Sequence, residues 1–259
     1  HVMMRTSDAT GEVMVNVITT HDKPEIMNEM SSFLVAQNPE ITTIVNNITD
    51  RKSMVAFGEK EVVYYGTGYI TEKLGNYSFR ISANSFFQTN TKQAERLYSV
   101  VKEFAGLKGN EIVYDLYSGT GSIAIYLSDS ASRVIGIELI GSAVDDAMRN
   151  AEFNGVKNCE FILGDLKDKL TKDISWATKF GNPDVVVLDP PRSGLHPKVV
   201  EEIIKINPGR IVYVSCNPST QARDSKMFVE GGYVLEFSQP ADMFPQTFHI
   251  ENVALLKKN

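Results

Sequence analysis

One stretch indicates how most of this chain folds: Val113-Tyr114-Asp115-Leu116-Tyr117-Ser118-Gly119-Thr120-Gly121-Ser122. It begins as an apolar run typical of a buried strand, turns at two glycines and leads into a helical pattern from Ser122 to Leu127. Gly119 and Gly121 allow a tight turn and a close approach of the backbone to a ligand. Two glycines are also compatible with an ordinary loop between a strand and a helix, so the choice depends on the residues that follow.

Acidic residues come at the ends of the next two predicted strands. The strand Val134–Glu138 ends in a carboxylate about twenty residues after the turn, the place from which an acid reaches the ribose hydroxyls of a bound nucleotide. Asp165 follows the strand Cys159–Leu163 and is placed to meet an adenine edge. These two acids favour a ligand-binding turn over an ordinary loop.

The turn itself distinguishes between two kinds of ligand. A dinucleotide pyrophosphate requires a third glycine or alanine at a set spacing, and Ala124 comes too early for it. Asp115 would repel a pyrophosphate but suits the cationic, phosphate-free S-adenosyl-L-methionine. From about Ser82 to its end, the chain resembles class I methyltransferases, and we therefore expect S-adenosyl-L-methionine as the cofactor.

The composition is that of an ordinary globular protein. The 259 residues are 42% hydrophobic and 22% charged, which suits one or two domains with full cores. No run approaches the roughly 18 apolar residues that span a bilayer, and no basic segment precedes an apolar one at the N-terminus. Two cysteines fit a reducing compartment, so we expect a cytoplasmic protein with no membrane partner. At a formal charge of −6, contact with a nucleic acid requires a local basic face or a segment outside this chain.

The pattern of elements predicts two domains. Residues 1–81 predict a small, partial α+β domain, and residues 82–259 predict a Rossmann-like α/β domain, because strands there alternate with helices. In the first domain we expect strands at Gly11–Thr19, Ile41–Ile48, Glu61–Tyr65 and Tyr77–Ser82 and a helix at Pro24–Gln37. In the second we expect helices at Thr91–Phe104, Ser122–Leu127, Ser142–Asn154, Pro197–Ile206 and Gln221–Glu230, between strands of a mostly parallel sheet. Its last two strands, Tyr233–Ser238 and Asn252–Lys257, are expected to pair antiparallel at one edge.

Two more strand ends carry reactive or rigid groups. Asp189 follows the apolar run Val185–Leu188 and precedes two prolines that stiffen the turn. Cys216 follows the run Arg210–Val214, and Asn217-Pro218 ends that strand. A thiol at the carboxyl end of a strand is a candidate nucleophile, although a lone cysteine is more often a buried packing residue.

Five motifs occur in order along the second domain. They are Phe86-Phe87-Gln88-Thr89-Asn90, Asp115-Leu116-Tyr117-Ser118-Gly119, Asp189-Pro190-Pro191-Arg192-Ser193-Gly194, Ser215-Cys216-Asn217-Pro218 and His249-Ile250-Glu251-Asn252. Together they resemble the RNA uracil-C5 methyltransferases that act on tRNA or 23S rRNA. The chain departs from that family at Ser122, where asparagine is frequent, and it lacks the N-terminal RNA-binding barrel and the four-cysteine iron–sulfur site of many relatives. We therefore expect it to be the central and catalytic portion of a longer protein.

The resemblance implies a mechanism and a set of site residues. Cys216 would add to C6 of the uracil, C5 would then take the methyl group, and Glu251 would remove the C5 proton. The expected donor-binding residues are Gln88, Tyr117, Gly119, Gly121, Ser122, Glu138, Asp189 and, from its place at a strand end, Asp165. The expected partner is RNA, with 23S rRNA ahead of tRNA, and the target base has to leave its stack. The alternatives are an RNA methyltransferase for another base or atom and a non-catalytic RNA-binding assembly factor.

Other polar residues have simpler interpretations. Cys159 begins an apolar strand and is expected in the core. His196 precedes Pro197, so it is expected to cap a helix or face water. Trp176 is expected to pack at the surface. No cluster of His, Cys and Asp has the spacing of metal ligands, so we expect no metal site.

Overall fold

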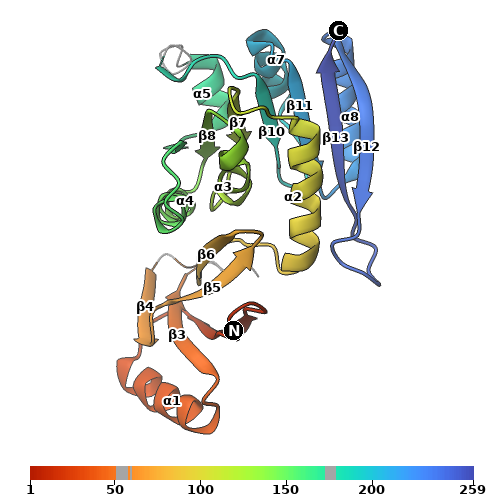
Figure 1. Cartoon of the computed structure of the whole chain (residues 1–259). Coiled ribbons are helices and arrows are strands. Elements are labelled where there is room, and N and C mark those ends of the chain that lie inside the picture. Colours follow the sequence, from red (N-terminus) through yellow and green to blue (C-terminus); the bar gives the residue numbers. More distant parts are fainter. Residues whose placement is uncertain (51–57, 59, 173–178) are drawn as a thin grey trace. The chain divides into compact units, whose positions relative to one another are not determined.

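A computed structural model describes residues 1–50, 58, 60–172 and 179–259 of the chain. Trp176 lies outside the described residues. The chain divides into two compact units, residues 1–87 and residues 88–259. The helices and strands of both units are labelled in Figure 1.

The first unit combines a four-stranded sheet, one helix and a hairpin. Its elements are β1 (Val2–Thr6), β2 (Val13–Thr19), α1 (Pro24–Gln37), β3 (Ile41–Ile48), β4 (Lys60–Tyr65), β5 (Tyr69–Leu74) and β6 (Tyr77–Ser82). The sheet order is β1-β2-β3-β4, with β2 and β3 parallel, and β5 pairs with β6 as a hairpin. Met27 of α1 packs in a core with Val15 and Ile44 of the sheet. Strand β1 was not expected, because its alternation of exposed and half-buried residues carries little apolar signal.

The second unit is a seven-stranded sheet covered by helices. Its elements are α2 (Thr91–Ala105), β7 (Ile112–Leu116), α3 (Ser122–Leu127), β8 (Arg133–Glu138), α4 (Gly141–Phe153), β9 (Cys159–Leu163), α5 (Leu166–Lys172), β10 (Val185–Leu188), α7 (Pro197–Ile206), β11 (Arg210–Ser215), α8 (Pro218–Glu230), β12 (Tyr233–Ala241) and β13 (Glu251–Lys258). The strand order is β12-β13-β11-β10-β7-β8-β9. The five strands from β11 to β9 are parallel, and β13 and β12 are antiparallel at one edge. This confirms the predicted Rossmann-like fold and its antiparallel edge.

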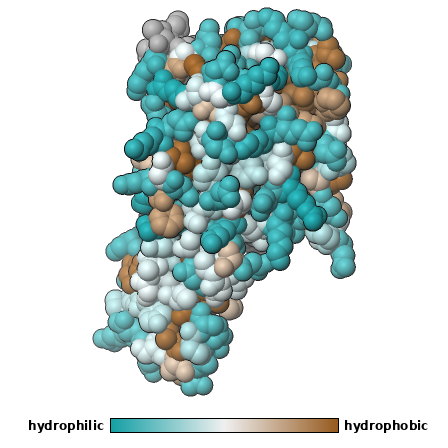
Figure 2. Space-filling model, viewed as in Figure 1, coloured by the Kyte–Doolittle hydropathy of each residue, from teal (hydrophilic) through white to brown (hydrophobic). Residues whose placement is uncertain are grey.

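Burial on both faces explains the composition of the central strands. All of β10 is buried, as are Val113 in β7 and Ile211–Val214 in β11. Helices α2, α3 and α4 lie along one face of the sheet, and α5, α7 and α8 lie along the other (Figure 1). Parallel strands covered in this way are continuous apolar runs rather than alternating ones. The outer surface seen in Figure 2 is mainly hydrophilic, with scattered hydrophobic side chains.

Some element boundaries differ from the prediction. Helix α8 begins at Pro218 instead of Gln221, because proline suits the first turn of a helix and Asn217 caps it by accepting from the Ser219 N–H at 3.1 Å. Strand β12 continues to Ala241, which shortens the connection to β13 to residues 242–250. Helix α5 was not expected, since it is short and polar. Among the described residues, no helix is long and apolar enough to cross a membrane.

Candidate active site

The sheet topology gathers the predicted side chains at one edge. The parallel strands β7, β8, β10 and β11 all end there, at Leu116, Glu138, Leu188 and Ser215. Strand β13 runs the other way and begins at the same edge, with Asn252 opposite Ser215. The residues next to this pair in sequence are Glu251 and Cys216. Two residues 35 positions apart in sequence are thus neighbours because β13 is antiparallel to β11.

The turn after β7 has a left-handed backbone at three positions. The φ angle is +67° at Tyr117, +51° at Gly119 and +76° at Gly121. The N–H groups of Tyr117 and Ser118 both donate to the carbonyl of Ile137, which anchors the turn to β8. A Cβ on Gly121 would lie 2.7 Å from the Phe161 ring, whereas a Cβ on Gly119 would meet nothing within 4 Å. Gly121 is therefore required for packing, and Gly119 leaves open space beside the turn.

Glu138 holds this turn from the neighbouring strand. Its Oε2 accepts from the Gly119 N–H at 3.0 Å, and its Oε1 accepts from the Ile140 N–H at 2.9 Å. Each carboxylate oxygen keeps a further acceptor site for a ligand hydroxyl. Asp165 is exposed, and its Oδ1 accepts from the Lys167 N–H at 2.8 Å, as a helix cap does at the start of α5.

Three carboxyl groups form an acidic cluster at the strand ends; Asp115 and Glu251 are buried and Asp189 is half-buried. Burial, together with the charges of Asp189 and then Glu138, raises the pKa of Asp115 to about 8. Burial and the charge of Glu251 raise the pKa of Asp189 to about 7. Burial likewise raises the pKa of Glu251 to about 7, against the opposing charge of Arg192. We call Asp115, Asp189 and Glu251 the acidic cluster.

Asp115 is the most unusual member of the acidic cluster. Its side chain is 1% exposed, and neither carboxylate oxygen makes a hydrogen bond of good geometry. A buried carboxyl group whose backbone donor, the Ala124 N–H, lies in poor geometry is costly, and a nearby cation would relieve that cost. The arrangement therefore suits a positively charged ligand.

Tyr98 is a site residue that the sequence did not reveal. Its hydroxyl lies 2.8 Å from the Ser122 Oγ. Burial raises its pKa, the Ser122 hydrogen bond opposes this, and the charges of all three members of the acidic cluster add to the increase. On α2 it occupies the apolar face beside Ala94, Leu97 and Val101, so its pattern is that of an ordinary core residue. No sequence signal separates it from the core.

Cys216 is influenced by a carboxyl group and by a guanidinium group. It is half-buried, and burial followed by the charge of Glu251 raises the pKa of its thiol. Arg192 opposes both effects through a hydrogen bond and through its charge. Arg192 also donates to Nδ1 of His249. The guanidinium is therefore the group in this part of the site that favours the thiolate.

The loop that carries Arg192 is held from α8. The carbonyl of Arg192 accepts from Asn217 Nδ2 at 3.0 Å and from Thr220 Oγ1 at 3.3 Å. Buried Asp224 accepts from the Leu195 N–H and from the Tyr213 hydroxyl, both at 2.8 Å. These bonds tie the loop after Asp189 to the strand and helix on either side of Cys216.

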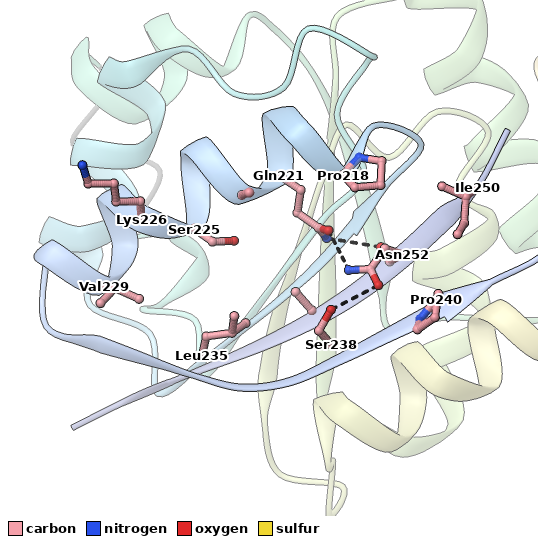
Figure 3. A pocket seen from close by; sticks show the side chains of 12 residues that line it. Pro218, Gln221, Ser225, Lys226, Val229, Leu235, Ser238, Pro240, Ile250 and Asn252 are labelled. Carbon is pink, nitrogen blue, oxygen red and sulfur yellow. Dashed lines mark hydrogen bonds between the residues drawn. The ribbon is translucent and has the colours of Figure 1, made fainter. Parts of the chain in front are cut away.

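A pocket of about 560 Å³ lies between α8 and the β12–β13 hairpin (Figure 3). Its lining is mainly apolar and includes Pro218 and Ile250, which belong to the motifs that carry Cys216 and Glu251. A buried amide pair is part of its lining: Asn252 Nδ2 donates to Gln221 Oε1 at 2.6 Å (Figure 3). Gln221 Nε2 also donates to the Tyr213 carbonyl at 2.7 Å. The pair ties α8 to β11 and β13, and so supports the alignment of Cys216 with Glu251.

The remaining predicted residues lie as follows. Gln88 opens the second unit, half-buried, two residues before Asn90, which caps α2. Cys159 is half-buried rather than fully in the core; its Sγ donates to the Ala124 carbonyl at 3.5 Å, and burial raises its pKa to about 12. His196 caps α7 by accepting from the Lys198 N–H at 3.2 Å, which confirms the predicted cap. Among the residues that the structure describes, no group of three or more His, Cys, Asp or Glu is arranged to hold a metal ion.

The fold and the glycine turn define the class of the protein. A mostly parallel sheet of this order with helices on both faces is the fold of S-adenosyl-L-methionine-dependent methyltransferases, and the methyl donor is the cofactor of that class. Residues 36–259 match the model of the tRNA (uracil-5-)-methyltransferase family, and the chain belongs to that family. This confirms the family indicated by the five motifs.

Individual relatives agree with this placement. The chain is 46% identical over its whole length to an RNA methyltransferase of Chlorobaculum tepidum, covering 53% of that protein. It is 45% identical to an RNA methyltransferase of Porphyromonas gingivalis, covering 55% of it. Among solved structures it is similar to the Pyrococcus abyssi tRNA (uracil-54, C5)-methyltransferase in complex with S-adenosyl-L-homocysteine, with a TM-score of 0.79 and 36% identity over 98% of this chain and 59% of that one. The chain thus spans about half the length of the curated relatives it matches.

Proposed function

We propose that this chain methylates C5 of a uracil in RNA, with S-adenosyl-L-methionine as donor and Cys216 as a covalent nucleophile. The observation that carries the proposal is the position of Cys216 and Glu251 at one sheet edge, beside Arg192 and the acidic cluster. We assign the chemistry to the second unit, and the role of residues 1–81 as a partial central domain remains a prediction. The cytoplasmic location also remains a prediction.

The residues around the turn fit the proposed donor. S-adenosyl-L-methionine supplies an electrophilic methyl group on a sulfonium. Its positive charge complements the acidic cluster, in which Asp115 is buried without a hydrogen bond of good geometry. The open space at Gly119 admits a ligand close to the backbone. The residues proposed to hold it are Gln88, Tyr117, Gly119, Gly121, Ser122, Glu138, Asp165 and Asp189.

Cys216 and Glu251 perform the covalent steps on the uracil. Cys216 Sγ, as the thiolate favoured by Arg192, bonds to C6 of the uracil, and the electron pair of the C5–C6 double bond moves toward C5 and the O4 enolate. C5 forms a bond to the methyl group as the sulfonium–methyl bond breaks, and the electron pair of that bond stays on the sulfur of the departing S-adenosyl-L-homocysteine. Glu251 then removes the proton from C5, and the electrons of that C–H bond restore the double bond as the sulfur leaves. A carboxyl group with a pKa of about 7 is well matched to this proton transfer near neutral pH.

The proposed RNA is 23S rRNA, ahead of tRNA, as the resemblance first indicated. The tRNA named for the P. abyssi relative makes tRNA the competing substrate. Parallel methylation of the two purified RNAs, followed by nucleoside analysis, decides between them. The expected result is 5-methyluridine in 23S rRNA. Its appearance in tRNA alone would mean that tRNA, and not 23S rRNA, is the substrate.

A trapping reaction tests the mechanism. The chain is incubated with S-adenosyl-L-methionine and RNA that contains 5-fluorouridine, whose C5 fluorine cannot leave as a proton. The expected product is a denaturation-resistant adduct that mass spectrometry maps to Cys216. An adduct at another residue, or methylation of another base or atom, would contradict the proposal. Binding of RNA without binding of the donor in calorimetry would favour a non-catalytic assembly factor instead.

A further inference from the structure

The loop between β12 and β13 presents an aromatic side chain to solvent. Phe248 is 89% exposed, the highest value among the large hydrophobic residues that the structure describes. Single exposed hydrophobic residues are common on protein surfaces and need no explanation by themselves. The position of Phe248 is what distinguishes it, because it lies three residues before Glu251 and next to His249.

Short hydrogen-bonded contacts shape the loop. Thr247 donates from both its N–H and its Oγ1 to the Phe244 carbonyl, at 3.1 and 2.8 Å. The Thr247 Oγ1 accepts from the His249 N–H at 3.2 Å, and Gln246 has a left-handed φ of +70°. These bonds hold the backbone on both sides of Phe248 in a defined turn.

A continuous series of contacts links Phe248 to the nucleophile. The ring centroids of Phe248 and His249 are 4.2 Å apart with their planes at 43°, and Phe244 meets His249 edge-on at 6.2 Å. His249 accepts from Arg192, whose guanidinium also hydrogen-bonds to Cys216. The aromatic surface thus continues outward from the site where the target base is proposed to react.

The charge beside this surface matches a nucleic acid. Arg192 is exposed. Arg223, half exposed, donates to the carbonyl of Ser193 in the same loop at 3.0 Å and pairs with Asp224 at 2.8 Å. Guanidinium groups next to an exposed aromatic ring are the combination that binds single-stranded RNA, since the ring stacks on a base and the cations neutralise phosphates. On a chain of net charge −6, the exposed guanidinium of Arg192 places a positive charge at the edge of the reaction centre, next to the aromatic ring.

We propose that Phe248, supported by His249, is a stacking platform for the nucleotide next to the target uracil in single-stranded RNA. This inference rests on the proposed function and adds a substrate contact to it. When a base leaves its stack to reach a catalytic pocket, its neighbour loses a stacking partner. The exposed Phe248 ring replaces that partner.

A double-mutant cycle tests the platform. The 259-residue chain, unmutated and with Phe248→Ala, is titrated with a single-stranded oligoribonucleotide of about seven residues with a central uridine. The titration is repeated with two RNAs that are abasic at the 5′ or the 3′ neighbour of that uridine. Phe248→Ala is expected to weaken binding of the intact RNA about 5- to 150-fold, and to have almost no effect on one abasic RNA. A purely structural role would give the same loss on all three RNAs.

A second variant reports on stacking directly. In a Trp176→Phe background, Phe248→Trp places an indole in the loop, and its fluorescence is expected to be quenched by the intact RNA and not by the same abasic RNA. Phe153→Ala is the matched control. Phe153 is also exposed, at 43%, but it lies at the end of α4 and not in the loop between β12 and β13. It is expected to leave RNA binding unchanged.

Three results would overturn the inference: equal affinities of Phe248→Ala and the unmutated chain, equal losses on all three RNAs, or no saturable RNA binding by the unmutated chain. The trapping reaction reports separately on the proposed function. If the Cys216 adduct forms but the double-mutant cycle shows no coupling, only the stacking role of Phe248 is wrong. If the cycle shows coupling but no adduct forms, only the uracil-C5 chemistry is wrong.

Discussion

The two sides of the sheet build the candidate site in different ways. On the side of β7 and β8, which we call the donor side, the site is mainly backbone: a turn with left-handed residues, held by Glu138 through two N–H groups, beside one carboxyl group of raised pKa, Asp115. On the side of β10, β11 and β13, which we call the acceptor side, the site consists of side chains whose pKa values are raised: Asp189, Cys216 and Glu251. We therefore expect substitutions on the donor side to change the stability of the fold and donor binding. Substitutions on the acceptor side should change the rate of the chemistry at nearly constant stability.

The largest effect is expected at the nucleophile. Cys216→Ala should lower methyl transfer by a factor on the order of 10⁴ or more, because the covalent route is lost, while donor binding is kept. Rates are measured by transfer of labelled methyl groups and donor binding by calorimetry. Cys159→Ala is the matched control, since this thiol donates only to a helix carbonyl, and it should keep full activity. Equal losses of methyl transfer in the two variants would contradict the assignment of Cys216 as the nucleophile and with it the contrast between the two sides.

Glu251→Gln should stop the reaction at a later point. The variant keeps a neutral side chain of the same size but lacks a base, so a methylated adduct on Cys216 should accumulate and turnover should fall by about 10² to 10⁴. In the unmutated chain, turnover should fall as pH drops below about 7, because Glu251, with its pKa of about 7, becomes protonated. Gel mobility and mass spectrometry detect the adduct. Free methylated RNA as the main product would contradict the assignment.

The two glycines of the turn offer a comparison within the donor side. Gly121→Ala should lower the free energy of unfolding by about 2–5 kcal/mol, from the sum of a left-handed φ and a clash with Phe161. Gly119→Ala should cost only about 1–2 kcal/mol for its φ, but the added methyl enters the open space and should weaken donor binding. Urea denaturation and calorimetry separate the two effects. Equal stabilities of the two variants would show that packing against Phe161 is unimportant.

Asp115 should make stability depend on pH. Its pKa is about 8 in the folded state and 3.8 as an ordinary aspartate, so the folded protein binds the extra proton between these values. The free energy of unfolding of the unliganded chain should therefore fall as pH rises from about 4 to about 8. Asp115→Asn should reduce this slope, raise stability at pH 8 by about 1–3 kcal/mol and weaken donor binding. Denaturation at pH 5 and pH 8 measures it, and parallel curves for both proteins would contradict the interpretation.

The smallest effect is expected on the acceptor side, at a side chain with a purely structural contact. His196→Ala removes the cap of α7 and should cost less than about 1 kcal/mol, with no change in methyl transfer. Denaturation and the methyl-transfer assay together test this. A large loss of activity would mean that the acceptor side is sensitive to any change, which would weaken the contrast between the two sides.

Local signals in the sequence were enough for the class of fold. β-Branched runs such as Val185–Leu188, the helical periods between them and the glycines after Leu116 each depend on near neighbours, so the mostly parallel sheet could be predicted. Pro218 and Asn217 marked the end of β11, and Pro197 marked the start of α7, because proline limits its own backbone and that of its neighbour. The family followed from the order of five such motifs.

Only the tertiary structure decided which of these residues meet. The antiparallel pairing of β13 with β11 brings Glu251 to Cys216, and the packing of α2 brings Tyr98 to Ser122. Desolvation by surrounding elements, and not the identity of the residues, raises the pKa values of Asp115 and Asp189. Contacts of this kind depend on strand register and on burial by segments that lie apart in the sequence, and no local pattern in the sequence encodes them.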